Sequence, residues 1–596
     1  MGNPVSNDDN NISRFSIPEG TILTDTLLQV IKYSRLNKIY SEAHDKNPIV
    51  LVNSLLELLD LNIDLPEEDL KNIPAEGAFI TVSNHPFKGI DSMLLFKLIH
   101  EKRSDFKILA SHLLHSIEPL QDIIIPVNTY EQPDPGKTSY TGIMESLNHL
   151  KSGHCIGIFP AAEDSKSWEA PKVILDDEWK ITVLKYIRLV NAPVIPVYFH
   201  GTKSRLSHII SRINPLLRNT ILPEELSNKK KRTIKIRIGT PITLKEQSSF
   251  EDISHFGQYL RARVYSLGLT LDPKQNYKKL AKKNKQKIES VISPVPSQTL
   301  SDEFNRIRSE YELFSTKNYS VLCTPISAIP NIFKEIGRLR EVTFREVGEG
   351  TNKSIDIDEY DFYYNHLFIW DTDENRIVGS YRLGKGKDIS ATYGLKGFYI
   401  SSLFRIKKDL LPILSESIEL GRSFITKDYQ KKVIPLFLLW KGIMIFLLKH
   451  SEYRYLIGPV SISNDLSKFS QSLIVRFFKS YFYNGELAAY IIPKKDFKLK
   501  PDNVIDARIF IDTSERDIQK IEHIIEDIEP GYSIPILLKK YMELNAKIIG
   551  FNIDPKFNNC LDGLIILDVF DAPKEVVKGL SREMNDPAIL ERFRAV

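Results

Sequence analysis

Cysteine is scarce in this sequence, and its few positions form no pattern. The 596 residues include three cysteines, Cys155, Cys323 and Cys560. They are odd in number and too widely spaced for a metal-ligand motif or a disulfide framework. We therefore expect a reducing, cytoplasmic environment and no metal site.

The sequence also lacks a strong excess of either charge. It has 80 Lys and Arg against 76 Asp and Glu, a formal net charge of +4. Proteins that bind nucleic acid concentrate positive charge in one domain or along one face. We therefore expect no nucleic-acid partner.

No apolar run is long enough to cross a bilayer. The most apolar stretch, Val433 to Leu448, is interrupted by Pro435 and Lys441 and is shorter than the roughly 20 residues that a spanning helix needs. The first twenty residues lack the apolar segment of a secretory signal. We expect a buried helix over 433–448, and a protein peripheral on the inner face of the cytoplasmic membrane.

The length calls for more than one domain, since a single hydrophobic core rarely serves more than about 250–300 residues. Residues 272–303 are rich in Lys, Asn and Gln and include "SPVPSQ". Such a composition buries too little apolar surface to form a core. We therefore predict a first domain over 1–271, a basic linker over 272–303 and a second domain over 304–596.

Strand-like runs indicate the fold class of each domain. In the first, "GAFITVSNHP", "CIGIFPAAE" and "APVIPVYFHG" are apolar, β-branched runs that end in polar or turn residues. They predict an α/β sheet whose distinctive residues converge where the strands end. In the second, "HLFIWD" and "RIVGSYRL" precede a predicted long helical stretch from Leu410 onward, which indicates an α+β domain.

The segment "SNHPFKGIDSML" places a histidine and an aspartate on either side of a turn. Pro86 and Gly89 make the chain turn between His85 and Asp91. A carboxylate bonded to one imidazole nitrogen leaves the other free to take a proton from a hydroxyl that attacks a thioester. The alternative is structural, with Asn84 starting the turn and Asp91 capping the following helix.

This segment resembles the histidine–aspartate motif of the glycerolipid acyltransferase superfamily. "IFPAAEDS" and "APVIPVYFHG" resemble later blocks of that superfamily, in the same order. The resemblance implies a glycerolipid-acyltransferase-like α/β domain that acylates a hydroxyl, with His85 and Asp91 as catalytic residues. It also implies contacts with the acceptor substrate from Asn84, Phe159, Pro160 and Glu163.

Two departures from the common motif narrow this resemblance. Five residues separate His85 from Asp91 instead of four, which resembles the branch that contains ornithine-lipid O-acyltransferases. Ala161 stands where the phosphate-binding block usually has glutamate, and no arginine follows, so Lys166 is the only nearby cation. Because a phosphate monoester needs fixed charge-assisted donors, we expect an acceptor without phosphate.

Several charged residues follow one another along the second domain, in the order Arg345, Asp358, Asp361, Arg382, Glu419 and Arg422. Taken singly, such residues usually form surface pairs. Together with the closing segment, they resemble the GNAT-like group of acyl-homoserine-lactone synthases and ornithine-lipid N-acyltransferases. That resemblance implies a GNAT-like α+β domain with Glu419 as the base that helps deprotonate an amine, donor pantetheine near Tyr429–Val433, and substrate binding by Asp358, Asp361, Arg382 and Arg422.

The two halves in one chain resemble bacterial bifunctional ornithine or glycine aminolipid synthases. This implies an amino acid that first receives a hydroxyacyl amide and then a second chain on its hydroxyl. The expected donor is acyl-acyl-carrier protein or acyl-CoA, with no bound cofactor, and the expected partners are acyl carrier protein, a membrane lipid surface, the amino acid and the lyso-lipid. The alternatives are a lysophospholipid (1-acylglycerol-3-phosphate) O-acyltransferase with a non-catalytic docking domain, and a lipid-binding scaffold without turnover.

Overall fold

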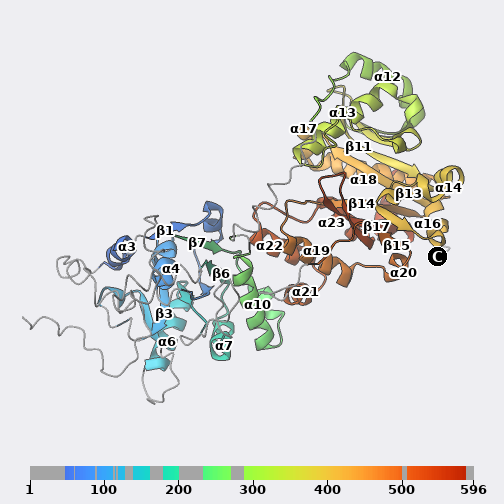
Figure 1. The fold of residues 1–596 in the computed structure, drawn as a ribbon. Helices are drawn as coiled ribbons and strands as arrows, with labels where there is room; N and C mark the ends of the chain where they lie inside the picture. Colours follow the sequence, from blue (N-terminus) through green and yellow to red (C-terminus); the bar gives the residue numbers. More distant parts are fainter. Residues whose placement is uncertain are drawn as a thin grey trace, which may run out of the picture. The chain divides into compact units, whose positions relative to one another are not determined.

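The computed structural model describes residues 47–58, 61–86, 90–111, 115, 118–127, 138–161, 179–200, 232–269, 271, 288–499 and 507–584. The chain divides into two compact units (Figure 1). One comprises Met1–Pro273 with Val504–Ile509, and the other Lys274–Asn503 with Phe510–Val596. Within the described ranges, no helix is both long enough and apolar enough to cross a membrane.

The first unit is built on a seven-stranded sheet with strand order β1-β7-β6-β2-β5-β3-β4. The strands are β1 (Leu61–Asp64), β2 (Phe79–Ser83), β3 (Lys107–Ser111), β4 (Ile124–Val127), β5 (Cys155–Ile158), β6 (Val194–Phe199) and β7 (Arg232–Ile238). All neighbouring strands are parallel except β6 and β7. This mainly parallel sheet confirms the predicted α/β class.

Helices cover both faces of this sheet. They are α3 (Pro48–Leu58), α4 (Ile90–His100), α6 (Thr138–Lys151), α7 (Ile181–Val190), α9 (Leu244–Ser248) and α10 (Ile253–Ser266). On one face, Phe96 of α4 joins Phe79 and Val197 in a buried core. On the other, the ring of Tyr198 lies 5.8 Å from that of Tyr265 on α10. Because β2, β5 and β6 are buried on both faces, they are the continuous apolar runs seen in the sequence.

The second unit is built on an eight-stranded sheet with order β16-β17-β14-β13-β11-β10-β9-β8. The strands are β8 (Glu312–Thr316), β9 (Tyr319–Pro325), β10 (Asn365–Asp371), β11 (Arg376–Lys385), β13 (Ser417–Ile425), β14 (Tyr455–Ile462), β16 (Lys547–Asp554) and β17 (Cys560–Asp568). Only β13 and β14 pair in parallel. The mainly antiparallel sheet with flanking helices confirms the α+β class.

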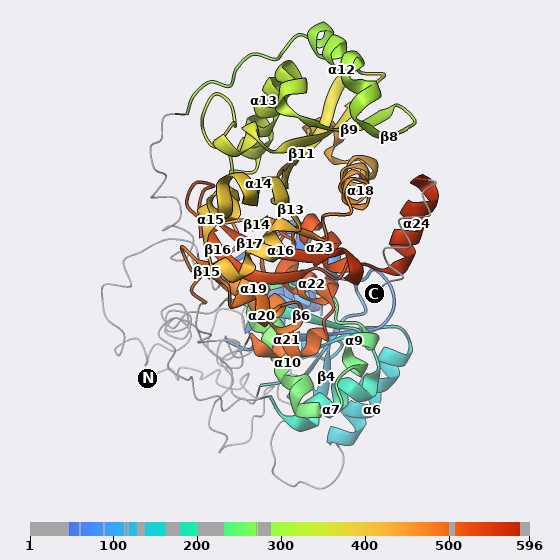
Figure 2. The same cartoon turned by 90° about the vertical axis from the view of Figure 1, so that its right-hand side faces the viewer.

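Helices lie on both faces of the second sheet, as Figure 2 shows. The longer ones are α12 (Ser297–Tyr311), α13 (Pro330–Glu346), α14 (Gly386–Tyr393), α18 (Val433–Lys449), α19 (Lys468–Tyr481), α22 (Ile518–Ile528), α23 (Ile536–Glu543) and α24 (Lys574–Met584). The shorter elements are α15 (Ile400–Leu403), α16 (Leu411–Ser415), α17 (Lys427–Gln430), α20 (Gly485–Ala488), α21 (Arg508–Ser514), β12 (Phe404–Ile406) and β15 (Ile491–Pro493). The ring of Phe304 on α12 stacks 4.8 Å from Trp370 of β10 in one core.

Helix α18 confirms the buried helix predicted over 433–448. Its inward side, including Leu439, Ile443 and Leu447, is buried. Gly442 permits this close contact, because a Cβ at that position would lie 2.9 Å from the Val321 side chain. The exceptions are Val433, Ile434 and Phe437 near its start, which are exposed.

The continuous helix predicted from Leu410 onward is wrong. Helix α16 ends at Ser415, and Ser417–Ile425 form strand β13 in the middle of the sheet. The segment "SIELGRSFI" was misread because Glu419 and Arg422 interrupt its apolar residues. Both side chains are satisfied by buried polar partners, so the segment belongs in the sheet interior.

The first helix described in the second unit begins within the range predicted as linker. Helix α12 starts at Ser297 and buries Leu300, Phe304 and Ile307 along a narrow stripe. Glu303 accepts a hydrogen bond from the Ile332 backbone N–H at 2.6 Å. The helix is otherwise polar, which explains why composition alone placed 297–303 outside the domain. Residues 272–287 lie outside the described ranges.

Candidate functional site

The predicted pair in the first unit is brought together. Strand β2 ends at Ser83 and is followed by His85, while Asp91 lies in the first turn of α4. His85 Nδ1 is 2.9 Å from Asp91 Oδ1, and the aspartate side chain is buried whereas 19% of the histidine side chain is exposed. A carboxylate at Nδ1 fixes the tautomer, so Nε2 is the nitrogen available to accept a proton.

Asn84, for which a contact with the acceptor substrate is predicted, bonds the backbone at the end of strand β6. Its Nδ2 donates to the Phe199 carbonyl at 2.9 Å, and its Oδ1 accepts from the Phe199 N–H at 2.8 Å. Only 1% of the residue is exposed. Asn84 therefore joins the ends of β2 and β6, and its expected contact with the acceptor stays a prediction.

Three neighbouring strands bring their final residues to this edge of the sheet. Strand β2 pairs in parallel with both β5 and β6, so His85, Phe159 and His200 follow the same ends. The rings of Phe159 and His85 are 4.7 Å apart, and Pro160 is buried. The convergence predicted from the strand ends is confirmed for these residues. Glu163 and Lys166 lie outside the described residues.

A buried group of three arginines and three aspartates dominates the polar interior of the second unit. Its members are Arg340, Arg382, Arg422, Asp356, Asp358 and Asp361. We call it the Arg–Asp cluster. Arg340 of α13 reaches Asp356 at 3.1 Å and pairs with both oxygens of Asp361, at 2.8 and 3.1 Å. Arg345, which the resemblance suggested, instead bonds Glu341 and backbone carbonyls.

The other two arginines join the same carboxylates from neighbouring strands. Arg382 of β11 lies 2.5 Å from Asp358 and 3.2 Å from Asp361. Arg422 of β13 lies 3.2 Å from Asp356 and 3.0 Å from Asp358. Burial alone would raise the pKa of Asp361, but Arg340 and Arg382 outweigh it and hold that pKa below its ordinary value. Asp361 therefore acts as a counter-ion to Arg340 and Arg382.

The charges of the Arg–Asp cluster are paired with one another inside the unit. Three guanidinium groups face three carboxylates, and Asp361 and Arg382 are almost completely buried. Breaking such a buried pair leaves an uncompensated charge, which typically costs about 3–5 kcal/mol. Asp358, Asp361 and Arg382 do not line the cavity described below, whereas Arg422 does, and the substrate-binding roles expected for them stay predictions.

Glu419 is enclosed among internal donors. Its Oε1 accepts from the Ile400 N–H at 2.7 Å, and its Oε2 accepts from the Tyr399 N–H at 3.0 Å and from the Tyr364 hydroxyl. Burial raises its pKa to about 7. It does not line the cavity described below. The structure thus places Glu419 in hydrogen bonds with the backbone of Tyr399 and Ile400, and its expected role as the base stays a prediction.

The cavity lies where two parallel strands separate. Pairing between β13 and β14 stops at Glu419 and Ile457. Beyond that point, Arg422 adopts a left-handed conformation with φ 51° near an irregularity in the β11–β13 pairing. Such a backbone is unfavourable for a side chain other than glycine, and the two aspartates that hold Arg422 offset the strain.

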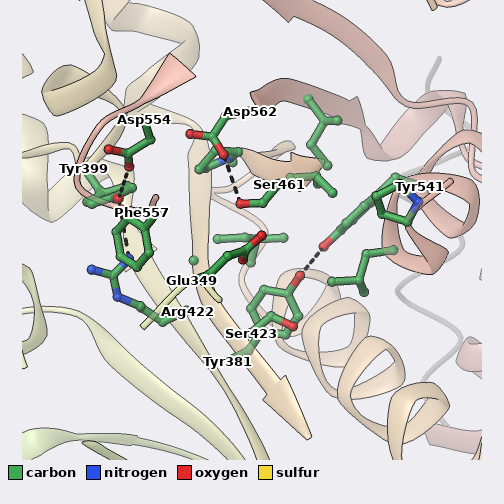
Figure 3. Close-up of a pocket in the computed structure, with 18 of the residues that line it drawn as sticks. Glu349, Tyr381, Tyr399, Arg422, Ser423, Ser461, Tyr541, Asp554, Phe557 and Asp562 are labelled. Atoms are coloured by element: carbon green, nitrogen blue, oxygen red, sulfur yellow. Dashed lines mark hydrogen bonds between the residues drawn. The ribbon is translucent and has the colours of Figure 1, made fainter. Parts of the chain in front are cut away.

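The cavity between these strands has a volume of about 330 Å³ (Figure 3). Its polar part includes Arg422 and three carboxylates, Glu349, Asp554 and Asp562. Ser461 donates a hydrogen bond to Asp562 at 2.9 Å. Burial, and then the neighbouring Asp554, raise the pKa of Asp562 to about 7, and burial raises that of Glu349 to about 7. These carboxyls can exchange a proton near neutral pH.

The remaining wall of the cavity is mainly apolar and aromatic. Tyr381 and Tyr541 face one another with hydroxyl oxygens 3.1 Å apart, as Figure 3 shows. Ile536, Leu537 and Ile565 complete this side. An amphipathic cavity of this kind suits a ligand with one polar reacting end and one hydrocarbon end.

Sequence reasoning missed the carboxylates of β16 and β17. Asp554 and Asp562 lie more than a hundred residues beyond Arg422, within the closing segment, whose resemblance gave no role to either residue. One signal was present, because Asp562 interrupts the apolar run "CLDGLIILD". A carboxylate inside a central strand is rarely buried without a structural or functional reason. In the part of the chain that the structure describes, no group of three or more His, Cys, Asp and Glu residues is placed to hold a metal ion.

Comparisons with known proteins match both halves of the chain. A family model described as "Acyltransferase" matches residues 26–274, and one described as "Acetyltransferase (GNAT) domain" matches residues 339–440. The chain is 31% identical to a glycine N(alpha)-acyltransferase of Phocaeicola vulgatus over 306 residues, which are 47% of this chain and 89% of that protein.

Two proteins of Bacteroides thetaiotaomicron are also similar to this chain. A glycine N(alpha)-acyltransferase is 30% identical over 299 residues, covering 47% of this chain and 86% of that protein. A lyso-glycine lipid O-acyltransferase is 25% identical over 251 residues, covering 40% of this chain and 88% of that protein.

Proposed function

Because the chain belongs to the same acyltransferase family as the glycine N(alpha)-acyltransferases that it matches, we propose that it is a bifunctional enzyme making a diacylated amino-acid lipid. The second unit would acylate the amine, and the first unit would acylate the hydroxyl of the resulting hydroxyacyl amide. The names of the relatives favour glycine over ornithine as the amino acid. The observation that carries this proposal is the presence of two separate constellations, His85–Asp91 and the cavity between β13 and β14, in one chain.

N-acylation requires an amine that has lost its proton. In this proposal Asp562 takes a proton from the ammonium group of the amino acid, and Ser461 orients that carboxylate by its hydrogen bond. The amine nitrogen then attacks the thioester carbonyl, the C–N bond forms and the C–S bond breaks. The nitrogen loses its extra proton and the departing thiolate gains one, so the products are an amide and a free thiol. The apolar wall around Tyr381, Tyr541 and Ile536 would hold the acyl chain.

O-acylation in the first unit follows the same bond changes with an oxygen nucleophile. His85 Nε2 accepts the proton of the acceptor hydroxyl while Asp91 stabilises the imidazolium that forms. The hydroxyl oxygen attacks the second thioester, the C–S bond breaks, and His85 returns the proton to the thiolate. The product is an ester.

We propose acyl carrier protein rather than CoA as the acyl donor, and the inner surface of the cytoplasmic membrane as the place of action. A diacylated product needs a bilayer to receive it, because each exposed methylene of its chains costs about 0.8 kcal/mol in water. The segment Tyr429–Val433, which we propose lies near the donor thioester, forms the end of α17 and the start of α18.

The acceptor of the first unit tests this proposal against the phospholipid alternative. We expect purified protein to use a lyso-aminolipid in preference to lysophosphatidic acid, because Ala161 replaces the usual glutamate and no arginine follows it. The measurement compares kcat/KM for the two acceptors with one acyl-carrier-protein donor. Equal or faster use of lysophosphatidic acid would instead support a lysophospholipid O-acyltransferase whose second unit is a docking module.

A further inference from the structure

Three hydroxyl groups follow one another along the mainly apolar wall of the cavity. Tyr381 of β11 and Tyr541 of α23 have their hydroxyl oxygens 3.1 Å apart (Figure 3). The hydroxyl of Ser423 on β13 bonds that of Tyr381. Only 5% of Tyr381 and 3% of Tyr541 are exposed, and all three residues line the cavity. We call Ser423, Tyr381 and Tyr541 the hydroxyl chain.

One O–H group of the hydroxyl chain has no acceptor inside the protein. Each hydroxyl carries one hydrogen to donate, and the two links of the chain use two of the three hydrogens. Within the ranges that the structure describes, the three hydroxyls make no other hydrogen bond. One O–H therefore remains for a ligand in the cavity, whichever way the hydrogens run. Leaving it covered by apolar groups would be unfavourable.

The hydroxyl chain begins beside the polar end of the cavity. Pairing of β11 with β13 is irregular between Ser380 and Arg382. Tyr381 lies in this irregularity, across from Arg422 and Ser423. Neighbouring strands are about 4.8 Å apart, so the hydroxyl chain starts next to the residue that brings positive charge to the cavity. An acyl chain whose carbonyl lies at the polar end would pass the hydroxyl chain within its first few carbons.

We propose that the hydroxyl chain selects an acyl donor that carries a hydroxyl near its carbonyl group. This rests on the proposed N-acylation, whose product needs such a hydroxyl as the acceptor for the first unit. The hydroxyl of the donor would accept a hydrogen bond from the remaining O–H. An unsubstituted acyl chain would cover that O–H with methylene groups, and a site that leaves its own polar group unpaired discriminates against such an analogue.

The test compares two acyl donors of equal length in a variant without the hydroxyl chain. Tyr381→Phe/Tyr541→Phe/Ser423→Ala removes all three hydroxyls together, so no partner stays unpaired and the wall keeps its shape. We measure kcat/KM for N-acylation of glycine by 3-hydroxypalmitoyl- and palmitoyl-acyl carrier protein. The wild type should favour the hydroxylated donor at least about tenfold, and the triple variant about threefold or less, because it uses the palmitoyl donor better.

The matched control is Tyr481→Phe, which removes a hydroxyl outside the cavity. That hydroxyl donates to the Ile511 carbonyl at 2.9 Å, and Tyr481 does not line the cavity. The control should keep the wild-type preference for the hydroxylated donor.

Binding of donor analogues gives the same comparison without turnover. Pantetheine amides of 3-hydroxypalmitic and palmitic acid cannot transfer their chains, and their Kd values are measured by calorimetry. We expect the wild type and Tyr481→Phe to prefer the hydroxylated amide, and the triple variant to lose that preference. Because the first unit is unchanged in these variants, a change in preference belongs to the second unit.

The outcomes separate this inference from the proposed function. Equal use of both donors by the wild type, or a preference that survives in the triple variant, would overturn it. An equal loss with both donors would also overturn it, since that is the result of a purely structural role. A wild type that acylates no amine, but whose preference for the hydroxylated amide is lost in the triple variant, would refute the proposed N-acylation and uphold the selection of a hydroxylated chain.

Discussion

Replacing His85 by alanine should lower O-acylation about 10²–10⁴-fold and leave N-acylation unchanged, so that the mono-acylated amino acid accumulates. The imidazole is held by Asp91 at 2.9 Å and is partly exposed at the strand ends, which is the geometry of a general base. Its loss corresponds to a rise of about 3–5 kcal/mol in the barrier of the second reaction only. The measurement is kcat/KM for a synthetic lyso-lipid acceptor with purified protein.

The control for this variant is His255→Ala, which removes a partly exposed imidazole from α10 of the same unit. It should retain O-acylation near the wild-type rate. Undiminished diacyl product from His85→Ala, with the control also active, would remove His85 from the mechanism. The first unit would then need another base.

Asp562→Asn should lower N-acylation by a similar factor, about 10²–10⁴, while O-acylation of supplied lyso-lipid persists. Asparagine keeps the shape but cannot accept the proton of the ammonium group. The pKa of Asp562 is raised to about 7, first by burial and then by Asp554, so the carboxylate form grows as pH rises through 7. The wild-type rate of N-acylation at limiting substrate should therefore increase with pH across this range, and that dependence should be lost in the variant.

Protein stability separates this effect from unfolding. A carboxyl whose pKa is raised on folding binds its proton more tightly in the native state, so it costs stability as pH rises from its unfolded pKa to about 7. Asp562→Asn removes that cost and should not lower the melting temperature at pH above 7. The control Asp373→Asn, in the exposed β10–β11 turn, should change neither activity nor stability. Full N-acylation by Asp562→Asn would transfer the role of base to Glu349 or Asp554.

Local sequence predicted the first site better than the second. His85 and Asp91 are six positions apart on one turn, and Phe159 follows a strand that reads plainly as apolar, so chain-local chemistry was sufficient. In the second unit Asp358, Asp361, Arg382 and Arg422, to which the resemblance assigns substrate binding, meet in the Arg–Asp cluster.

What each residue of the second site does could not be predicted from that order. Arg340, which the sequence analysis does not single out, joins the cluster, whereas Arg345 on the same helix bonds Glu341. The order also does not show that the oxygens of Glu419 accept hydrogen bonds from the N–H groups of Tyr399 and Ile400. Asp562 comes from the far end of the chain, and only the separation of β13 from β14 brings it to the cavity.

The central claim is that one chain carries two successive acyl transfers, and lipid analysis of living cells tests it most directly. The wild-type protein and the His85→Ala and Asp562→Asn variants would be expressed in a bacterial host without aminolipids, and total lipid analysed by mass spectrometry. We predict phosphorus-free diacylated amino-acid lipid from the wild type, only its mono-acylated precursor from His85→Ala, and neither from Asp562→Asn. Wild-type cells that contain no aminolipid but show altered phospholipid acyl chains would contradict the account.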